Sequence, residues 1–237
     1  MKGPILALQF LTRLPLPRVE ADAGDFAASM RWFPAAGIVI GAILAAAAWG
    51  GARIDAWTGA LAALAAWVLV TGALHLDGLA DLADAHGAIH KGRERLLAVL
   101  ADPHVGSFGV VAVVVQLIAK LVLLHGLVAA GAPAVLILIP FAARISPLAW
   151  TLWLPPLHEG LASRFRAAVR WRDVILWSLP CAAAAWFAPA LLVAPVLIAA
   201  WGLKVRRTLG GISGDAHGAG IEMVETGLLA TFLLQFG

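Results

Sequence analysis

Long apolar runs alternate with short polar segments along almost the whole chain. A helix needs roughly 20 mainly apolar residues to cross about 30 Å of hydrocarbon. The pattern therefore predicts an all-α, polytopic helical membrane protein with about seven transmembrane helices. The expected spans are about 33–50, 56–76, 107–130, 133–157, 173–188, 190–203 and 221–236. The fifth and sixth runs are short and are separated by Ala188 and Pro189, so a single bent hairpin is the alternative there.

The basic residues alternate between the two sides of these predicted spans. On one side, Arg53 is the only basic residue in the connections. The other side carries Lys2, Arg13, Arg18, Arg31, Lys91, Arg93, Arg95, Arg164, Arg166, Arg170, Arg172, Lys204, Arg206 and Arg207. Because Lys and Arg accumulate in cytoplasmic loops, the N-terminus is expected in the cytoplasm and the C-terminus on the other side. No repeat or linker divides the chain, which predicts one integral membrane domain over residues 1–237.

Composition excludes several other classes of protein. Hydrophobic residues make up 62% of the 237 residues and charged residues 13%, against about 25% charged in soluble domains. The single cysteine, Cys181, rules out a disulfide within the chain and a cysteine-rich metal site. The net charge of +3 does not indicate nucleic-acid binding, because the charges are divided among short loops instead of forming one basic face.

Three aspartates follow the second apolar run at helical spacing. Asp77, Asp81 and Asp84 occupy positions i, i+4 and i+7, which lie on one face of a helix. Like charges this close repel each other, and a divalent cation would remove that cost. Carboxylate oxygens without cysteine suit Mg²⁺ or Mn²⁺. The pattern favours a metal site over the alternative, a solvated acidic loop at a helix end.

Two glycine-rich segments are expected on the same side of the membrane. The first runs from Asp102 through Gly106 to Gly109, directly before the third span. Its glycines would let backbone N–H groups approach a phosphate at a helix N-terminus, although an ordinary helix cap is the simpler interpretation. The second segment, 210–220, contains Asp215, a further candidate metal ligand. A flexible connector is the alternative for this segment.

Four other polar residues each fit more than one role. His75 and His217 lie beside these segments, and a lone histidine near a membrane interface is more often structural. Lys120 and Arg144 lie within predicted spans, where a charge is expensive and usually faces the interior of the bundle. Phosphate binding, a buried carboxylate and helix packing all remain open for these two basic residues.

Together these motifs resemble the cobalamin synthase family, the adenosylcobinamide-GDP ribazoletransferases. The matching stretches run in order from residue 6 to about 225. They are Phe10-Leu11-Thr12-Arg13-Leu14-Pro15-Leu16-Pro17, Phe33-Pro34 with Gly37 and Gly41, His75-Leu76-Asp77-Gly78-Leu79-Ala80-Asp81, Asp102 with Gly106 and Gly109, and Gly211-Ile212-Ser213-Gly214-Asp215. Each stretch alone would be weak evidence, but the ordered combination is specific.

The resemblance implies a Mg²⁺-dependent transferase in the cytoplasmic (inner) membrane, with its active site facing the cytoplasm. Its substrates would be adenosylcobinamide-GDP and α-ribazole or its 5′-phosphate, and GMP would be released. The resemblance leaves open a homo-oligomer or association with other cobalamin-pathway enzymes. The expected metal ligands are Asp77, Asp81 and Asp215, and the expected catalytic carboxylates are Asp84 and Asp102. The residues expected to bind substrate are Arg13, His75, Gly78, His104, Gly106, Gly211, Gly214 and His217.

The sequence departs from the family pattern around Asp102. A basic residue usually precedes this aspartate and Ser-Arg follows it, whereas Ala101, Pro103 and His104 stand here. Two basic groups that would hold phosphate are therefore missing. Ser213 stands where threonine is usual, which keeps the hydroxyl group.

Two other functions compete with this interpretation. The CDP-alcohol phosphotransferases of phospholipid synthesis also use aspartate-rich motifs in a helical membrane protein. Their Asp-Gly is followed by Ala-Arg, whereas Asp81 occupies the arginine position here. A non-catalytic transporter or scaffold would need polar groups near mid-span, and only Gln116, Lys120 and Arg144 qualify.

Overall fold

The computed structural model describes residues 2–157 and 161–236, and this part of the chain consists of helices, the loops and turns that connect them, and one isolated bridge between Pro156 and Ile212. The helices are α1 (Lys2–Leu11), α2 (Ala23–Ser29), α3 (Phe33–Gly51), α4 (Ala56–Thr71), α5 (Leu74–Gly87), α6 (Arg93–Leu100), α7 (Ser107–Ala129), α8 (Leu138–Ala143), α9 (Ser146–Trp153), α10 (Leu161–Ala168), α11 (Trp171–Ala185), α12 (Ala194–Thr208) and α13 (Gly214–Phe236). Short 3-10 turns occupy Met30–Trp32, Ile89–Lys91, Pro133–Ile137 and Pro189–Val193. The all-α, polytopic membrane fold predicted from the sequence is confirmed.

The number of long apolar helices is smaller than the seven expected. Among the described residues, five helical segments are long and apolar enough to cross a membrane: Ala23–Gly51, Ser107–Ala129, Pro133–Trp153, Pro189–Thr208 and Gly214–Phe236. The bent pair α4 and α5 raises the number to six if the two helices form one span. The fifth predicted run corresponds to α11, which has only 15 residues and contains Pro180.

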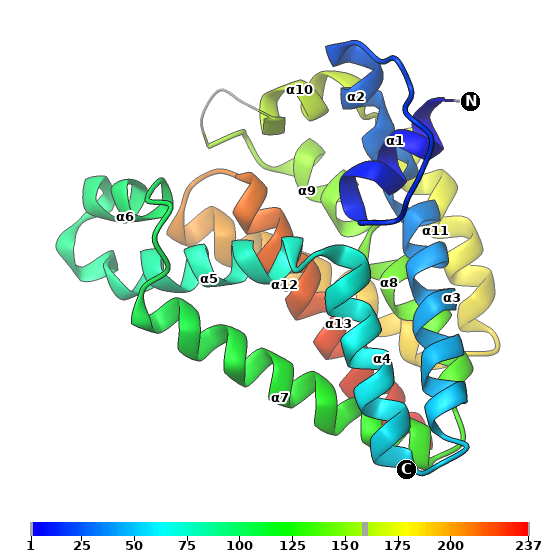
Figure 1. The fold of residues 1–237 in the computed structure, drawn as a ribbon. Coiled ribbons are helices and arrows are strands. Elements are labelled where there is room, and N and C mark those ends of the chain that lie inside the picture. The colour runs from blue at the N-terminus through cyan, green and yellow to red at the C-terminus, as the bar shows by residue number, and fades with distance from the viewer. Residues whose placement is uncertain (1, 158–160, 237) are drawn as a thin grey trace.

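The two ends of the bundle differ in structure. Helices α1, α2 and α10 form a cap at one end, and the C-terminus lies at the opposite end (Figure 1). Inside the cap, Phe10 is central. Its ring centroid lies 5.3 Å from that of Phe26, 5.7 Å from that of Phe33 and 6.2 Å from that of Phe165. This aromatic cluster fixes the N-terminal segment against α3 and α10.

A sharp bend separates α4 from α5. The two helix axes differ in direction by 85°. Gly72 and Ala73 both adopt the left-handed conformation, with φ of 61° and 59°. Such a φ is uncommon for a residue with a Cβ, so Ala73 stores strain at the turn. We therefore treat α4 as the membrane-crossing part of the pair and α5 as a helix that turns away across the end of the bundle.

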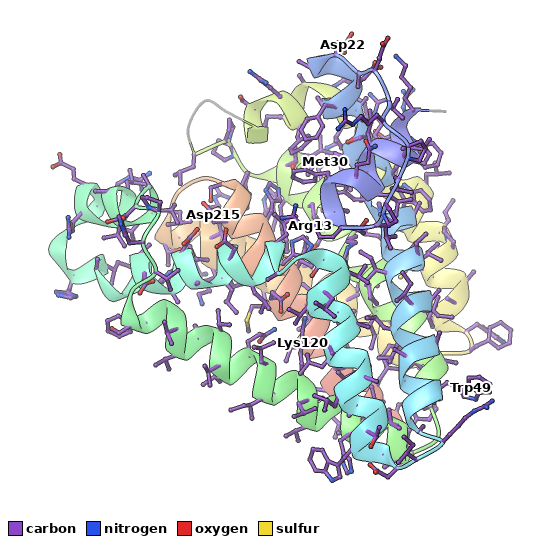
Figure 2. All side chains as sticks on the ribbon, viewed as in Figure 1. Arg13, Asp22, Met30, Trp49, Lys120 and Asp215 are labelled. Atoms are coloured by element: carbon purple, nitrogen blue, oxygen red, sulfur yellow. The ribbon has the colours of Figure 1, made fainter. Side chains whose placement is uncertain are left out.

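A buried ionic network joins the long helices. In α7, Lys120 Nζ lies 2.8 Å from Glu222 Oε2 and 2.7 Å from Glu225 Oε2, both in α13. Arg144, which follows α8, donates from Nη1 to Glu225 Oε1 at 2.7 Å. Arg144 and Glu225 are completely buried, and Lys120 is 2% exposed. Two cations and two carboxylates thus neutralise each other deep in the bundle, where Lys120 lies farther from the cap than Asp215 (Figure 2).

Removing one member of this network should destabilise the fold. Glu225→Leu would leave Arg144 without its carboxylate in the protein interior, and breaking a buried ion pair costs about 3–5 kcal/mol. Lys2→Gln breaks an exposed pair with Asp25 and should change stability by less than about 1 kcal/mol. Tryptophan fluorescence during unfolding in mixed dodecyl maltoside and SDS micelles measures both variants.

A double variant separates lost charge balance from lost packing. Adding Arg144→Met to Glu225→Leu removes the unpaired cation and should recover part of the stability. Equal stabilities of Glu225→Leu and Lys2→Gln would contradict the stabilising role of the network.

Candidate active site

An amphipathic cavity lies between the cap and the end of the bundle. Its volume is about 230 Å³. One wall is apolar and includes Phe10, Phe33 and Phe165 of the aromatic cluster. The opposite wall is polar and includes His75, Asp77, Gly78, Gly214, Asp215 and His217, from the N-terminal turns of α5 and α13. The structure thus brings together six of the predicted site residues, although Gly78 and Gly214 are 136 positions apart in the chain.

Helices α5 and α13 cross closely at this wall. A Cβ built at Gly78 would lie 2.8 Å from both the Cα and the carbonyl oxygen of Asp215. At the next turn, a Cβ at Gly218 would lie 3.3 Å from the Cα of His75. The absence of side chains at these two glycines lets the helices approach and brings Asp77 and Asp215 to one cavity. Gly78 therefore acts through backbone packing in this structure.

The aspartates of α5 form the predicted stripe on one helix face. Asp77 is exposed, whereas Asp81 and Asp84 are half-buried. Burial, followed by the charges of Asp77, Asp215 and Asp84, raises the pKa of Asp81 to about 6. After burial, the neighbouring carboxylates thus contribute to the raised pKa of Asp81, and a cation would relieve this repulsion.

Asp84 is already engaged by the protein. Its Oδ2 accepts from the backbone N–H of Gly106 at 2.7 Å, and its Oδ1 accepts from that of Gly109 at 2.9 Å. These N–H groups belong to the first turn of α7, which otherwise lacks partners. The anion at this helix N-terminus is thus a protein carboxylate. A Cβ at Gly106 would lie 2.5 Å from Asp84 Oδ1, which explains the need for glycine there.

Asp102 and His104 form a separate pair in the loop before α7. Asp102 Oδ1 accepts from the backbone N–H of His104 at 3.0 Å and lies 2.7 Å from its Nδ1. The hydrogen bond from His104 is the main reason that the pKa of Asp102 is lowered. A histidine that donates from Nδ1 presents Nε2 as an acceptor. Neither residue lines the cavity between the cap and the bundle.

The two cavity histidines differ in their bonding. His217 donates from Nδ1 to the carbonyl oxygen of Ser213 at 2.9 Å, and its Nε2 lies 3.1 Å from the Thr151 hydroxyl. Both ring nitrogens are thereby engaged, and the contact with Thr151 connects α13 to α9. His75 is buried, and its Nε2 has no hydrogen-bond partner among the described residues. The nitrogen of His75 is consequently the better candidate for a ligand contact.

The remaining predicted residues hold the local backbone. Arg13 donates its backbone N–H to Val70 O at 2.7 Å, and its side chain covers Gly72 at the bend. Gly211 lies against the segment after α9, where Ile212 N donates to Pro155 O at 2.8 Å. A Cβ at Gly211 would approach Pro155 O to 2.9 Å. These contacts stabilise the two chain segments that border the cavity.

Asp77, Asp81 and Asp215 provide the oxygen-only donor set that Mg²⁺ prefers. Within the described residues, no group of three or more acidic, histidine or cysteine side chains already has the spacing of metal ligands. The donor chemistry and the mutual repulsion nevertheless suit a divalent cation. Asp84 fits this set less well, because both of its oxygens accept backbone hydrogen bonds.

The sequence alone does not predict the ionic network beneath the cavity. It places Lys120 and Arg144 inside spans without identifying their partners, and its motifs give no role to Glu222 or Glu225. The available signal was their position, since opposite charges inside different spans are expected to pair. Glu222 and Glu225 also stand one helical turn apart in the last apolar run.

The close crossing of α5 and α13 gives a testable consequence. Gly78→Ala should force the helices apart at Asp215, lower stability by about 1–3 kcal/mol through overpacking and displace Asp77 from Asp215. Gly50→Ala is the matched control, because a Cβ at Gly50 meets nothing within 4 Å. Thermal unfolding in detergent would measure the change in stability. Disulfide trapping between cysteines introduced in α5 and α13 would measure the displacement of the helices. Identical behaviour of the two variants would contradict the close crossing.

The chain resembles one family over nearly its whole length. Residues 3–233 match the family model described as cobalamin-5-phosphate synthase. The adenosylcobinamide-GDP ribazoletransferase of Novosphingobium aromaticivorans is 67% identical over 233 residues, which cover 97% of this chain and 95% of the relative. The protein of the same name from Thiobacillus denitrificans is 48% identical, with 97% and 94% covered, and that from Brevibacillus brevis is 34% identical, with 97% and 96% covered. No solved structure matches the chain.

Proposed function

This chain belongs to the cobalamin-5-phosphate synthase family, and we propose that it catalyses the reaction named in its curated relatives. The reaction joins adenosylcobinamide-GDP to α-ribazole, or to its 5′-phosphate, and releases GMP. The observation that carries this proposal is the 67% identity over 97% of the chain to a protein of that name. The family match confirms the resemblance that the motifs indicated.

The chemistry is a phosphoryl transfer. A ribose hydroxyl of α-ribazole attacks the phosphorus next to adenosylcobinamide, the bond from this phosphorus to the GMP oxygen breaks, and the hydroxyl proton passes to a base. Negative charge grows on the transferring group and on the leaving GMP. Catalysis of this kind depends mainly on positioning and on charge stabilisation.

We assign Asp77, Asp81 and Asp215 as ligands for Mg²⁺. Bound there, the ion would supply positive charge to the pyrophosphate. Asp77 and Asp215 line the cavity, and the close crossing of α5 and α13 at Gly78 keeps the two helices in register. The raised pKa of Asp81 supports this assignment, because burial and then the charges of Asp77 and Asp215 raise it.

We assign different roles to Asp84 and Asp102. Asp84 holds the first turn of α7 through two backbone hydrogen bonds, so we assign it to positioning. Asp102 orients His104 at 2.7 Å, and neither residue lines the cavity. We therefore propose that this pair binds the part of adenosylcobinamide-GDP that remains outside the cavity.

The aromatic wall suits the smaller substrate. A cavity of about 230 Å³ is too small to enclose a corrinoid, whereas the benzimidazole base of α-ribazole is flat and apolar. Phe10, Phe33 and Phe165 would pack against that base, and aromatic pairs add about 0.5–1.5 kcal/mol beyond area burial. The corrinoid would then remain outside the cavity with its pyrophosphate directed toward Asp77.

The distribution of basic residues supports the location in the inner membrane with a cytoplasmic active site. Most of the Lys and Arg residues belong to the cap, to the segment from α5 to α6 and to the last turns of α12. Such residues accumulate on the cytoplasmic side. Both substrates would then reach the cavity from the compartment in which nucleotides are available.

The metal assignment predicts loss of turnover without loss of fold. Asp81→Asn and Asp215→Asn should each lower GMP formation by at least a hundredfold, because an amide replaces a charged ligand. His104→Gln should raise the KM for adenosylcobinamide-GDP more than it lowers kcat, because His104 lies outside the cavity that we assign to α-ribazole. Purified protein in nanodiscs is supplied with both substrates and Mg²⁺, and GMP and the corrinoid product are separated by chromatography, with EDTA as a control.

Glu20→Gln serves as the matched variant, because Glu20 is exposed and lies away from the cavity. Normal turnover in Asp81→Asn would contradict the ligand assignment. Equal rates with and without EDTA would contradict the use of Mg²⁺. Absence of both products in folded wild-type protein would contradict the ribazoletransferase function itself.

The aromatic wall predicts a selective effect on one substrate. Phe165→Ala should raise the KM for α-ribazole about 5–10-fold and leave the KM for adenosylcobinamide-GDP nearly unchanged. Phe26→Ala is the matched control, because Phe26 packs 5.8 Å from Phe165 in the same cluster but does not line the cavity. Initial rates with each substrate varied in turn measure the difference. A larger change for adenosylcobinamide-GDP would contradict the assignment of the cavity to α-ribazole.

A further inference from the structure

Helix α5 has two chemically different faces. Asp77, Asp81 and Asp84 follow one face, and the opposite face carries Leu79, Leu82 and Ala83. Since α5 turns 85° away from α4, it extends across the end of the bundle with α7 beneath it (Figure 1). The apolar face of α5 therefore lies over a space between the membrane helices.

This space is a groove of about 630 Å³ formed by α5, α7, α12 and α13. The volume lies within the range of about 300–1,000 Å³ typical of ligand sites. Phe108, Val111 and Val115 of α7 line it and are each about 60% exposed. The groove shares no lining residue with the cavity that contains Asp77 and Asp215. It is thus a second, separate apolar site.

The charge at the groove favours an anionic occupant. Lys204, in the last turns of α12, lines the groove, and no aspartate or glutamate does. Lys204 Nζ lies 5.2 Å from the centre of the Trp201 ring. Arg207 follows three residues later, on the same helix face. Neither Lys204 nor Arg207 forms an ion pair with a described residue.

We infer that this groove binds an anionic phospholipid, with one acyl chain under α5 and the phosphate beside Lys204. An acyl chain matches the apolar walls, which lie between helices that cross the bilayer. Basic pockets between such helices on the cytoplasmic side attract anionic headgroups. The lipid packs beneath the helix that carries the carboxylate stripe, so it supports the position of that helix from the membrane side.

Native mass spectrometry of the full chain in dodecyl maltoside tests this site. The probes are dioleoyl phosphatidylglycerol, which is anionic, and dioleoyl phosphatidylcholine, which is not. Wild-type protein should bind one phosphatidylglycerol saturably and more tightly than phosphatidylcholine. Lys204→Gln should weaken phosphatidylglycerol binding about fivefold, the contribution of one basic residue near an anionic headgroup, and leave phosphatidylcholine unchanged. Arg206→Gln is the control. Arg206 stands two residues after Lys204 in α12, so its side chain points away from that of Lys204.

A second pair of variants tests the groove itself. Ala112→Trp fills it and should abolish retention of the lipid, whereas Val114→Trp adds the same side chain to an exposed position of α7 outside the groove. Thermal unfolding confirms that each variant is folded. The inference is overturned if wild-type protein shows no saturable phospholipid, if Ala112→Trp and Val114→Trp retain it equally, or if α-ribazole displaces it. Lys204 is exposed, so we expect Lys204→Gln to fold. If Ala112→Trp does not fold, the lipid binding of Lys204→Gln still tests the inference.

Discussion

The pairing of Lys120 and Arg144 with Glu222 and Glu225 is the interaction on which the arrangement of the long helices depends. These groups are buried where neither water nor a polar lipid headgroup can solvate them, so each charge must be neutralised by another. The pairs connect α7, the end of α8 and α13 at one level of the bundle. Apolar packing alone determines the positions of helices in a membrane less strictly, because lipid tails are as apolar as the helix surfaces.

The position of α13 then determines the geometry of the polar end. Asp215 stands in the first turn of α13, about two turns before Glu222. Fixing the glutamates therefore also fixes where Asp215 emerges beside α5. The glycine contacts at Gly78 and Gly218 complete the crossing, and Asp84 connects the far end of α5 to α7. The carboxylate stripe is thus supported by contacts along the whole of α5.

Helix α5 separates two environments. Its acidic face meets the cavity and the polar end, whereas its apolar face covers the groove between membrane helices. The position of the acidic face consequently depends on what fills the space beneath it. This arrangement gives a physical reason for the reaction to occur in a membrane protein, since the helix that carries the proposed metal ligands is packed on one side by protein and bordered on the other by hydrocarbon.

The sequence by itself determined the class of fold and the order of the motifs. Apolar run length and the alternation of basic residues are local properties, so they predict membrane helices and the two sides of the bundle without tertiary information. The helical stripe of Asp77, Asp81 and Asp84 was likewise visible, because spacing along one helix depends on neighbouring residues only. Helix α11 has only 15 residues, with the polar Arg172 and Asp173 in its first turn and Pro180 inside it, so it is shorter than the usual span.

Only the tertiary structure decided how these pieces meet. The partners of Asp84 are the backbone N–H groups of Gly106 and Gly109, which no side-chain pattern reveals. The crossing at Gly78 joins residues far apart in the chain, and it depends on the 85° bend at two left-handed residues, one of which is an alanine. Long-range contacts of this kind depend on the whole packed bundle. A local sequence pattern can therefore indicate which residues belong to the site, but it cannot identify the residues that they contact.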